Sequence, residues 1–357
     1  MVARPAFHVL TVGDVRRESD DAVSIALTVP PALRTTFTFR AGQYLTLRRP
    51  GDPADERRSY SLCSAPGDED LRIGVREIPQ GIVSTWLNRD LQPGMTVDCM
   101  PPDGQFGAVV TSREPRHLLL VAVGSGITPL LSLAKAALAS HPKNCVTLLY
   151  GNRRLSTTMF REELEDLKNR YLDRLALHCV FSREAQEFAL YDGRLDGARV
   201  QEFLTRLVPI SSVDEAFLCG PHAMLNEVEG LLREAGLAEE RIHVERFGVA
   251  DIPVITRAEV LAPHSALITV IVDSARRDIE LKDSTVSILD AARAAGLDLP
   301  FSCKSGVCAT CRARVLEGEV TMTRNFALLK SDLAAGIVLS CQAHPVTSRV
   351  VISFDER

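Results

Sequence analysis

The sequence has no excess of basic residues, since 41 lysines and arginines are set against 46 aspartates and glutamates. Its formal charge at pH 7 is -5, and acidic and basic residues are intermixed along the chain. Proteins that bind the phosphate backbone of a nucleic acid need clustered positive charge. We therefore expect no nucleic-acid partner.

The sequence also lacks a long unbroken apolar run. Residues 1–18 reach charged side chains without the apolar core of a secretory signal, so we expect a cytoplasmic protein. The most apolar segment, HLLLVAVGSGITPLLSLAKAALAS at 117–140, is interrupted by Gly124, Gly126 and Pro129. These breaks favour a strand, a turn and a helix over a membrane span, and we expect no membrane contact.

Internal repeats and low-complexity tracts are absent as well, so the 357 residues are expected to form two or three ordinary domains. Residues 7–110 read as short alternating runs such as QYLTLRR and RSYSLCS, which predict an antiparallel barrel or sandwich. From RHLLLVAV onwards, apolar strands alternate with amphipathic helices, which predicts a parallel sheet. After a proline-containing linker, a hairpin and a short helix precede a cysteine-rich loop.

The odd number of cysteines, nine in a long chain, favours metal ligands and free thiols over a disulfide framework. Cys303, Cys308 and Cys311 follow the spacing C-x4-C-x2-C, and Cys341 follows after 29 intervening residues. This is the pattern of plant-type ferredoxins, which hold a 2Fe-2S cluster. A zinc site that includes His344, or four cysteines buried by chance, remain as less favoured alternatives.

A dinucleotide site is suggested by GSGITP, where a glycine pair lies between a strand and a helix start that can bind pyrophosphate. Pro129 replaces the last glycine of the usual G-x-G-x-x-G fingerprint, so an ordinary tight turn fits this feature equally well. Arg153 and Arg154 follow the second strand, and Ser182 and Arg183 follow the third. Together they suit a 2'-phosphate and favour NADPH, although solvated arginines are the alternative.

The fourth strand of the predicted sheet ends in FLCGPHAML, which places Cys219, Gly220 and Pro221 at the carboxyl edge where ligands bind. Cys219 is thus a candidate neighbour of a nicotinamide ring. A buried free cysteine that packs as a small apolar side chain is the alternative.

A flavin is implied because NADPH delivers two electrons as hydride, whereas the cluster accepts one at a time. In RRSYSLCS, Arg58 is a candidate phosphate ligand, Tyr60 a ring that stacks on the isoalloxazine, and Ser61 a hydroxyl that hydrogen-bonds it. Tyr60 would otherwise be an ordinary barrel aromatic. These residues alone leave FAD and FMN open.

The segment QGIVSTWLN predicts a helix start at which Gly81, Val83 and Ser84 suit the flavin pyrophosphate. The alternative for Ser84 is a simple N-cap.

Taken together, these motifs resemble the ferredoxin-NADP reductase superfamily over 7–247 and a plant-type ferredoxin over the last ninety or so residues. The resemblance implies an FAD-binding antiparallel β-barrel at 1–111, an NADP-binding α/β parallel-sheet domain at 112–248, a linker at 249–265 and a β-grasp (α+β) ferredoxin domain at 266–357.

The resemblance also adds roles for individual residues. It places Tyr60, Ser61 and Cys219 around the reacting rings, and Phe247 over the flavin until nicotinamide displaces it, with a core role for Phe247 as the alternative. The positions expected to contact FAD or NADPH are Arg58, Tyr60, Ser61, Gly81, Val83, Ser84, Gly124, Gly126, Thr128, Pro129, Arg153, Arg154, Ser182, Arg183, Cys219, Gly220, Pro221 and Phe247.

The domain order resembles that of reductases that feed multicomponent oxygenases. Through FRAGQYLTLR, HVERF and DLPFSCKSGVCATC, the chain resembles in particular the reductase subunits of phenylacetyl-CoA epoxidases. The predicted function is therefore electron transfer from NADPH through FAD and a 2Fe-2S cluster to a di-iron oxygenase. A reductase for a Rieske-type or steroid oxygenase is the alternative of the same class, and a non-enzymatic iron-sulfur redox sensor is that of another class.

Overall fold

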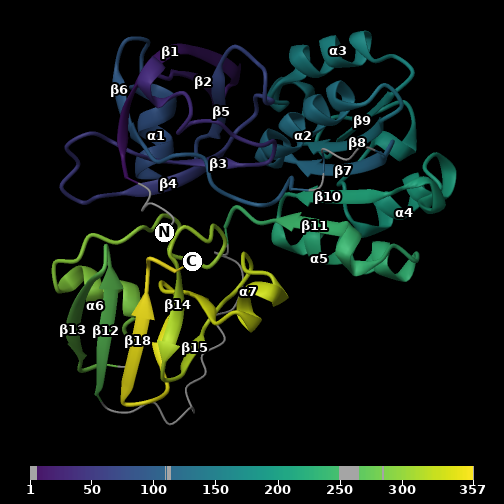
Figure 1. Cartoon of the computed structure of the whole chain (residues 1–357). Helices are drawn as coiled ribbons and strands as arrows, with labels where there is room; N and C mark the ends of the chain where they lie inside the picture. Colours follow the sequence, from purple (N-terminus) through teal and green to yellow (C-terminus); the bar gives the residue numbers. More distant parts are fainter. Residues whose placement is uncertain (1–5, 109, 111–113, 249–264, 284, 357) are drawn as a thin grey trace. The chain divides into compact units, whose positions relative to one another are not determined.

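The computed structural model describes residues 6–108, 110, 114–248, 265–283 and 285–356. Residues 7–247 form one compact unit, and a second is built mainly from the residues after 247 (Figure 1). The predicted linker at 249–265 lies outside the described residues except for its last position. No helix in the described ranges is both long enough and apolar enough to cross a bilayer.

The first part of the larger unit is a six-stranded antiparallel sheet in the order β4-β3-β6-β1-β2-β5. A bridge between Leu62 and Ile73 links the two edges, so the sheet closes into the predicted barrel. Helix α1 (Ile82–Arg89) packs Trp86 and Leu87 into its core. The strands are β1 (His8–Ser19), β2 (Ala22–Thr28), β3 (Tyr44–Arg48), β4 (Arg57–Ser61), β5 (Leu71–Arg76) and β6 (Thr96–Cys99).

The second part is a five-stranded parallel sheet in the order β11-β10-β7-β8-β9, as the alternation of strands and helices predicts. The strand order reverses between β7 and β10, and ligands bind beyond the carboxyl ends of the strands at such a reversal. Its elements are β7 (His117–Val123), α2 (Ile127–Ser140), β8 (Cys145–Asn152), α3 (Arg161–Arg170), β9 (Leu175–Phe181), α4 (Gly197–Arg206), β10 (Glu215–Cys219), α5 (His222–Glu234) and β11 (Ile242–Glu245).

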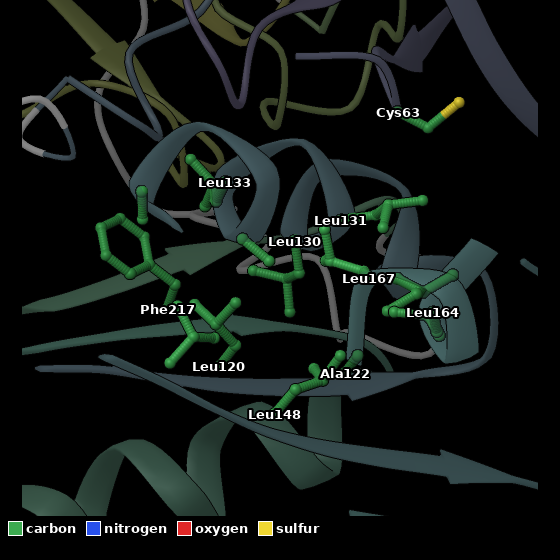
Figure 2. Close-up of a cluster of buried hydrophobic side chains, with 14 of the residues drawn as sticks. Cys63, Leu120, Ala122, Leu130, Leu131, Leu133, Leu148, Leu164, Leu167 and Phe217 are labelled. Carbon is green, nitrogen blue, oxygen red and sulfur yellow. The ribbon is translucent and has the colours of Figure 1, made fainter. Parts of the chain in front are cut away.

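Helix α2 is held to this sheet by fully buried leucines. Figure 2 shows Leu130 and Leu133 of α2 on one side of the cluster and Leu120, Leu148 and Phe217 of the sheet on the other. All five side chains are less than 1% exposed. Burying a leucine contributes about 1.5–3 kcal/mol, so this layer fixes the helix whose start faces the carboxyl edge.

The C-terminal domain is of the predicted α+β class, with a mixed sheet in the order β13-β12-β18-β14-β16. The predicted hairpin is present as β12 and β13, and β12 runs parallel to β18. Its elements are β12 (Ala266–Val272), β13 (Ala275–Leu281), α6 (Ile288–Ala294), β14 (Arg312–Glu317), β15 (Val320–Met322), α7 (Lys330–Ala334), β16 (Ile337–Leu339), β17 (Ala343–Pro345) and β18 (Arg349–Ser353).

The barrel and the parallel-sheet domain pack closely at Gly74 of β5. A Cβ atom at Gly74 would lie 2.5 Å from the Thr128 methyl group and 2.8 Å from the ring of Phe160. Phe160 has a left-handed backbone (φ 56°), and its amide donates a hydrogen bond to Glu18 of β1 at 3.0 Å. A side chain at position 74 would therefore push the start of α2 away from the barrel.

Replacing Gly74 by alanine tests how much the close packing at this position contributes to stability, apart from the loss of backbone conformational freedom that any Gly→Ala change causes. We expect Gly74→Ala to destabilise the protein by about 1–3 kcal/mol, because the added methyl overpacks a closed interface. Gly230→Ala is the matched control, since Gly230 lies inside α5 with no atom within 4 Å of an added Cβ. The control should be neutral or stabilising by up to about 1 kcal/mol. Equal urea midpoints for the two variants would contradict the packing argument.

Candidate functional site

The cysteine loop between α6 and β14 has an unusual backbone. Lys304, Gly306 and Ala309 all have positive φ angles, of 50°, 83° and 55°. Such left-handed residues turn successive amide groups inward and create concave sites for negative charge. The Ser305 amide already donates a hydrogen bond to the sulfur of Cys303 at 3.4 Å. The loop is thus shaped to direct N–H groups at sulfur.

The four cysteines form two hydrogen-bonded pairs. A hydrogen bond from Cys308 lowers the pKa of Cys303 to about 5, and one from Cys311 lowers the pKa of Cys341. Each pair therefore offers a thiolate, the form that binds metal. Two adjacent pairs of cysteines suit a cluster with two irons and four cysteine ligands.

The glycine turn of the parallel-sheet domain lies against the end of β10. A Cβ atom at Gly126 would be 2.1 Å from the Cys219 carbonyl oxygen, so only glycine fits there. Gly124 has a left-handed backbone (φ 59°). Thr128 is buried and donates its hydroxyl hydrogen to the Ser125 carbonyl at 3.0 Å, while Pro129 lies within the first turn of α2. The turn thus brings the start of α2 beside Cys219, Gly220 and Pro221.

A barrel arginine also reaches this turn, and the sequence did not single it out. Arg76, at the end of β5, donates a hydrogen bond to the Thr157 carbonyl at 2.7 Å. Its Nη1 atom would be 3.0 Å from a Cβ at Gly124. Arg76 also pairs with Asp21 at 3.3 Å, and the barrel thereby places its guanidinium group beside the glycine turn.

The residues proposed for the 2'-phosphate lie side by side. The Ser182 amide donates to the Asn152 carbonyl and the Arg183 amide to the Arg153 carbonyl, both at 2.9 Å, which extends the pairing of β8 and β9 into the loops. Arg153, Arg154 and Arg183 are exposed. None of the three guanidinium groups pairs with a carboxylate within the described part of the chain. The loops therefore offer three uncompensated cations at one edge of the sheet.

Helix α1 begins after Gly81, as expected, and lacks a side-chain cap at its first turn. The Ser84 hydroxyl accepts a hydrogen bond from the Ile78 amide at 3.1 Å and donates one to the carbonyl oxygen of Gly81, the N-cap residue, at 3.4 Å, so it links the preceding turn to the helix start. Val83 and Ser84 are buried. The first amides of a helix have no partner within the helix, which leaves them for an anion.

Arg58 and Tyr60 lie two positions apart on β4 and differ in exposure. The Arg58 side chain is half exposed and forms an ion pair with Glu56 at 2.9 Å. Tyr60 packs against the barrel core, and burial raises the pKa of its hydroxyl. Tyr60 is thus neutral at physiological pH. To bind a phosphate, Arg58 would have to give up its ion pair with Glu56.

The barrel meets the carboxyl edge of the parallel sheet at Ser61. Its hydroxyl donates to the Glu245 carboxyl group at 3.3 Å, across 184 residues of sequence. Glu245 ends β11 and is the register partner of Cys219 in β10. Burial of the carboxyl group raises the pKa of Glu245 to about 8, and burial next to Glu245 raises that of Cys219. Ser61, Cys219 and Glu245 therefore form one group that is largely uncharged at pH 7.

Glu245 was missed from sequence, although it stands in the quoted motif HVERF. The available signal was a carboxylate at the end of a short strand next to an exposed aromatic residue. That aromatic, Phe247, is 45% exposed, which excludes a core role for it.

Comparisons with known proteins agree with this layout. Residues 10–107 match the oxidoreductase FAD-binding domain, 120–230 the oxidoreductase NAD-binding domain, and 270–346 the 2Fe-2S iron-sulfur cluster binding domain. The chain is 41% identical over 351 residues to a component of the 1,2-phenylacetyl-CoA epoxidase of Escherichia coli (strain K12), covering 98% of both chains. The chain belongs to the ferredoxin-NADP reductase superfamily.

This reductase is also similar to further oxygenase components. It is 33% identical to the ferredoxin reductase component of 3-ketosteroid-9-alpha-monooxygenase from Rhodococcus rhodochrous, over 97% of this chain and 96% of that one. Its fold matches phthalate dioxygenase reductase with a TM-score of 0.60 at 22% identity, over 98% of both chains. The predicted electron-transfer function from NAD(P)H and the predicted FAD and 2Fe-2S cofactors are confirmed.

The raised pKa of Glu245 should be visible in the pH dependence of stability. A carboxyl that holds its proton up to about pH 8 when folded, against a usual value of 4.5, stabilises the protein fully below about pH 4.5. That contribution is lost as the pH rises towards 8. We expect the melting temperature of the wild type, taken relative to that of Glu245→Gln, to fall from pH 5 to pH 8. Above pH 8 this difference should stay constant.

Glu240→Gln, which changes an exposed glutamate in the turn before β11, is the control and should follow the wild-type curve. A wild-type curve parallel to that of Glu245→Gln would show that the carboxyl titrates normally.

Proposed function

We propose that hydride from NADPH reaches FAD at the junction of Ser61, Cys219 and Glu245, and that single electrons then pass through the cluster to a di-iron oxygenase. The observation that carries this proposal is the 3.3 Å hydrogen bond between Ser61 and Glu245. It joins the end of a barrel strand to the carboxyl edge of the parallel sheet. Flavin and nicotinamide must meet at such a junction, with reacting atoms about 3–3.5 Å apart.

At this junction, each residue has a positioning or proton-holding role. FAD, when bound, accepts hydride from the nicotinamide and releases electrons one at a time. Tyr60 would offer its ring as a stacking surface. The Ser61 hydroxyl would give up its hydrogen bond to Glu245 and form one with the edge of the flavin. Cys219 would frame the nicotinamide as a neutral thiol. Phe247, being exposed, is free to cover the flavin between turnovers.

Backbone amides and cations would hold the phosphates. The uncapped start of α1, at Gly81, Val83 and Ser84, together with Arg58, suits the flavin pyrophosphate. Gly124, Gly126, Thr128 and Pro129 at the start of α2, with Gly220 and Pro221 opposite them, would line the site of the NADPH pyrophosphate. Arg76 adds a charge from the barrel side.

Preference for NADPH over NADH rests on the three uncompensated arginines with Ser182. Arg153 and Arg183 come from loops joined by a backbone hydrogen bond, so they approach one ligand from neighbouring strands. A 2'-phosphate offers them charge-assisted hydrogen bonds that a ribose hydroxyl does not.

The electron acceptor is proposed from similarity. Identity of 41% over nearly the whole chain to a phenylacetyl-CoA epoxidase component supports a di-iron oxygenase of phenylacetate degradation as the partner. A steroid oxygenase is the second candidate, supported by 33% identity to the 3-ketosteroid-9-alpha-monooxygenase component. NADPH oxidation coupled to product formation, measured with each purified oxygenase in turn, decides between them.

The domain limits at 1–111, 112–248, 249–265 and 266–357, and a location in the cytoplasm, complete the proposal. None of the nine cysteines forms a disulfide bond in the described part of the chain, as is usual for proteins of reducing compartments.

The ligand set Cys303, Cys308, Cys311 and Cys341 can be tested with Cys308→Ser. We expect this variant to lose electron delivery to a one-electron acceptor such as cytochrome c, because the cluster cannot assemble. Flavin bleaching by NADPH under anaerobic conditions should persist, since the junction is untouched. Cys145→Ser, at the start of β8, is the control and should retain both activities. Full cluster absorbance in Cys308→Ser would remove Cys308 from the ligand set.

The 2'-phosphate site can be tested with Arg183→Ala. Loss of one charge-assisted hydrogen bond costs about 1.5–3 kcal/mol, so the KM for NADPH should rise about tenfold or more. The KM for NADH should not change. Arg170→Ala, an exposed arginine at the end of α3, should leave both constants unaltered. Parallel increases for NADPH and NADH in Arg183→Ala would point to a general loss of binding instead.

A further inference from the structure

Gln342 directly follows the fourth cysteine of the cluster motif, and its side chain is turned back into the cysteine loop. The residue is 6% exposed. Its side-chain nitrogen Nε2 lies 3.5 Å from the Cys341 sulfur, 3.0 Å from the Cys341 carbonyl oxygen and 3.0 Å from the Lys304 carbonyl oxygen. A buried side-chain amide thus contacts both a ligand sulfur and the backbone of the loop that carries the other ligands.

The orientation of this amide follows from its partners. Carbonyl oxygens only accept hydrogen bonds, so the atom that faces Lys304 and Cys341 must be the NH2 group. The opposite atom, Oε1, accepts a hydrogen bond from the Thr323 hydroxyl at 2.8 Å. Thr323 also donates its backbone amide to the Gln342 carbonyl at 3.0 Å. Thr323 therefore holds both the side chain and the backbone of Gln342 in place.

Close packing removes the remaining freedom of the side chain. A Cβ atom at Gly306 would lie 3.3 Å from Cγ of Gln342 and 3.1 Å from the Arg324 carbonyl oxygen. The NH2 group has two hydrogens for three acceptors, so one N–H is shared between the carbonyl oxygen and the sulfur of Cys341. An N–H donor fixed in this way adds a partial positive charge next to a ligand sulfur.

We propose that Gln342, oriented by Thr323, is a positioning residue that raises the reduction potential of the 2Fe-2S cluster through its hydrogen bond to the Cys341 sulfur. The proposal rests on Cys341 being a cluster ligand, as proposed above. Reduction adds one negative charge to the cluster and its sulfurs. An N–H donor at sulfur stabilises the reduced form more than the oxidised form, which raises the potential. Gln342 thus favours transfer of each electron from FAD to the cluster.

The decisive experiment is a spectroelectrochemical titration of the full-length, FAD- and cluster-loaded protein and its Gln342→Met variant. Met fills a similar volume but has no N–H donor. We expect the equilibrium constant for one-electron reduction of the cluster by a fixed mediator to fall about tenfold, which corresponds to about 59 mV. The flavin midpoint in the same sample should not move. Thr269→Val, which removes a buried hydroxyl bonded to Asp278 on β12 and β13, is the control and should leave the cluster potential unchanged.

A second measurement distinguishes the hydrogen bond from Gln342 to the Cys341 sulfur from its hydrogen bond to the Lys304 carbonyl oxygen. The reduced cluster is paramagnetic, so a proton hydrogen-bonded to its ligand sulfur gives a hyperfine coupling that disappears in D2O. We expect one such exchangeable coupling to be absent from Gln342→Met. A Gln342→Met protein with full iron content, an unchanged cluster potential and all exchangeable couplings present overturns the proposal.

Thr323→Val keeps Gln342 and all four cysteines and tests the same idea if Gln342→Met does not assemble a cluster. It should lower the potential in the same direction but by a smaller factor, because the amide loses its fixed orientation. An unchanged potential in Thr323→Val, with no cluster in Gln342→Met, would overturn the proposal. Cys341→Ser tests the ligand assignment separately. A normal cluster spectrum in this variant would contradict the assignment of Cys341 as a ligand, whereas an unchanged potential in the other variants would contradict the role of Gln342.

Discussion

Contact between the barrel and the start of helix α2 is the constraint on which the reaction site depends. Gly74 lets Thr128 and Phe160 press against β5, and Gly126 lets the glycine turn press against the Cys219 carbonyl. Hydride transfer tolerates little error in distance, with reacting atoms about 3–3.5 Å apart. Two positions without a side chain therefore determine how closely the barrel, the start of α2 and the end of β10 approach one another.

The packing of the barrel against the parallel sheet also keeps the charge low at the junction of Ser61, Cys219 and Glu245. Closing the barrel onto the sheet buries the Glu245 carboxyl, which raises its pKa to about 8, and encloses Cys219 beside it. A neutral acid donates a hydrogen bond, whereas a carboxylate only accepts one. The group of Ser61, Cys219 and Glu245 can thus offer hydrogen-bond donors without a net negative charge.

The fold and the cofactors could be predicted because their signals are local. Strand alternation, the glycine turn GSGITP and the spacing of four cysteines each lie within short stretches of chain. Glu245, Arg76 and Gln342 could not be predicted, because their roles depend on contacts with residues far away in sequence, such as Ser61 for Glu245. Strand β1 could not be recognised from the sequence for another reason. Two irregularities, after Val12 and after Arg17, interrupt its alternating pattern.

The two redox sites share one physical strategy despite their different folds. At the junction, the Ser61 hydroxyl donates to the Glu245 carboxyl group, whose pKa is raised by burial to about 8. In the cysteine loop, the donors are the Ser305 amide and the side chain of Gln342. Preorganised N–H and O–H donors of this kind need no rearrangement when negative charge arrives beside them. In each case the donor and the group that it contacts lie in the same compact unit of the chain.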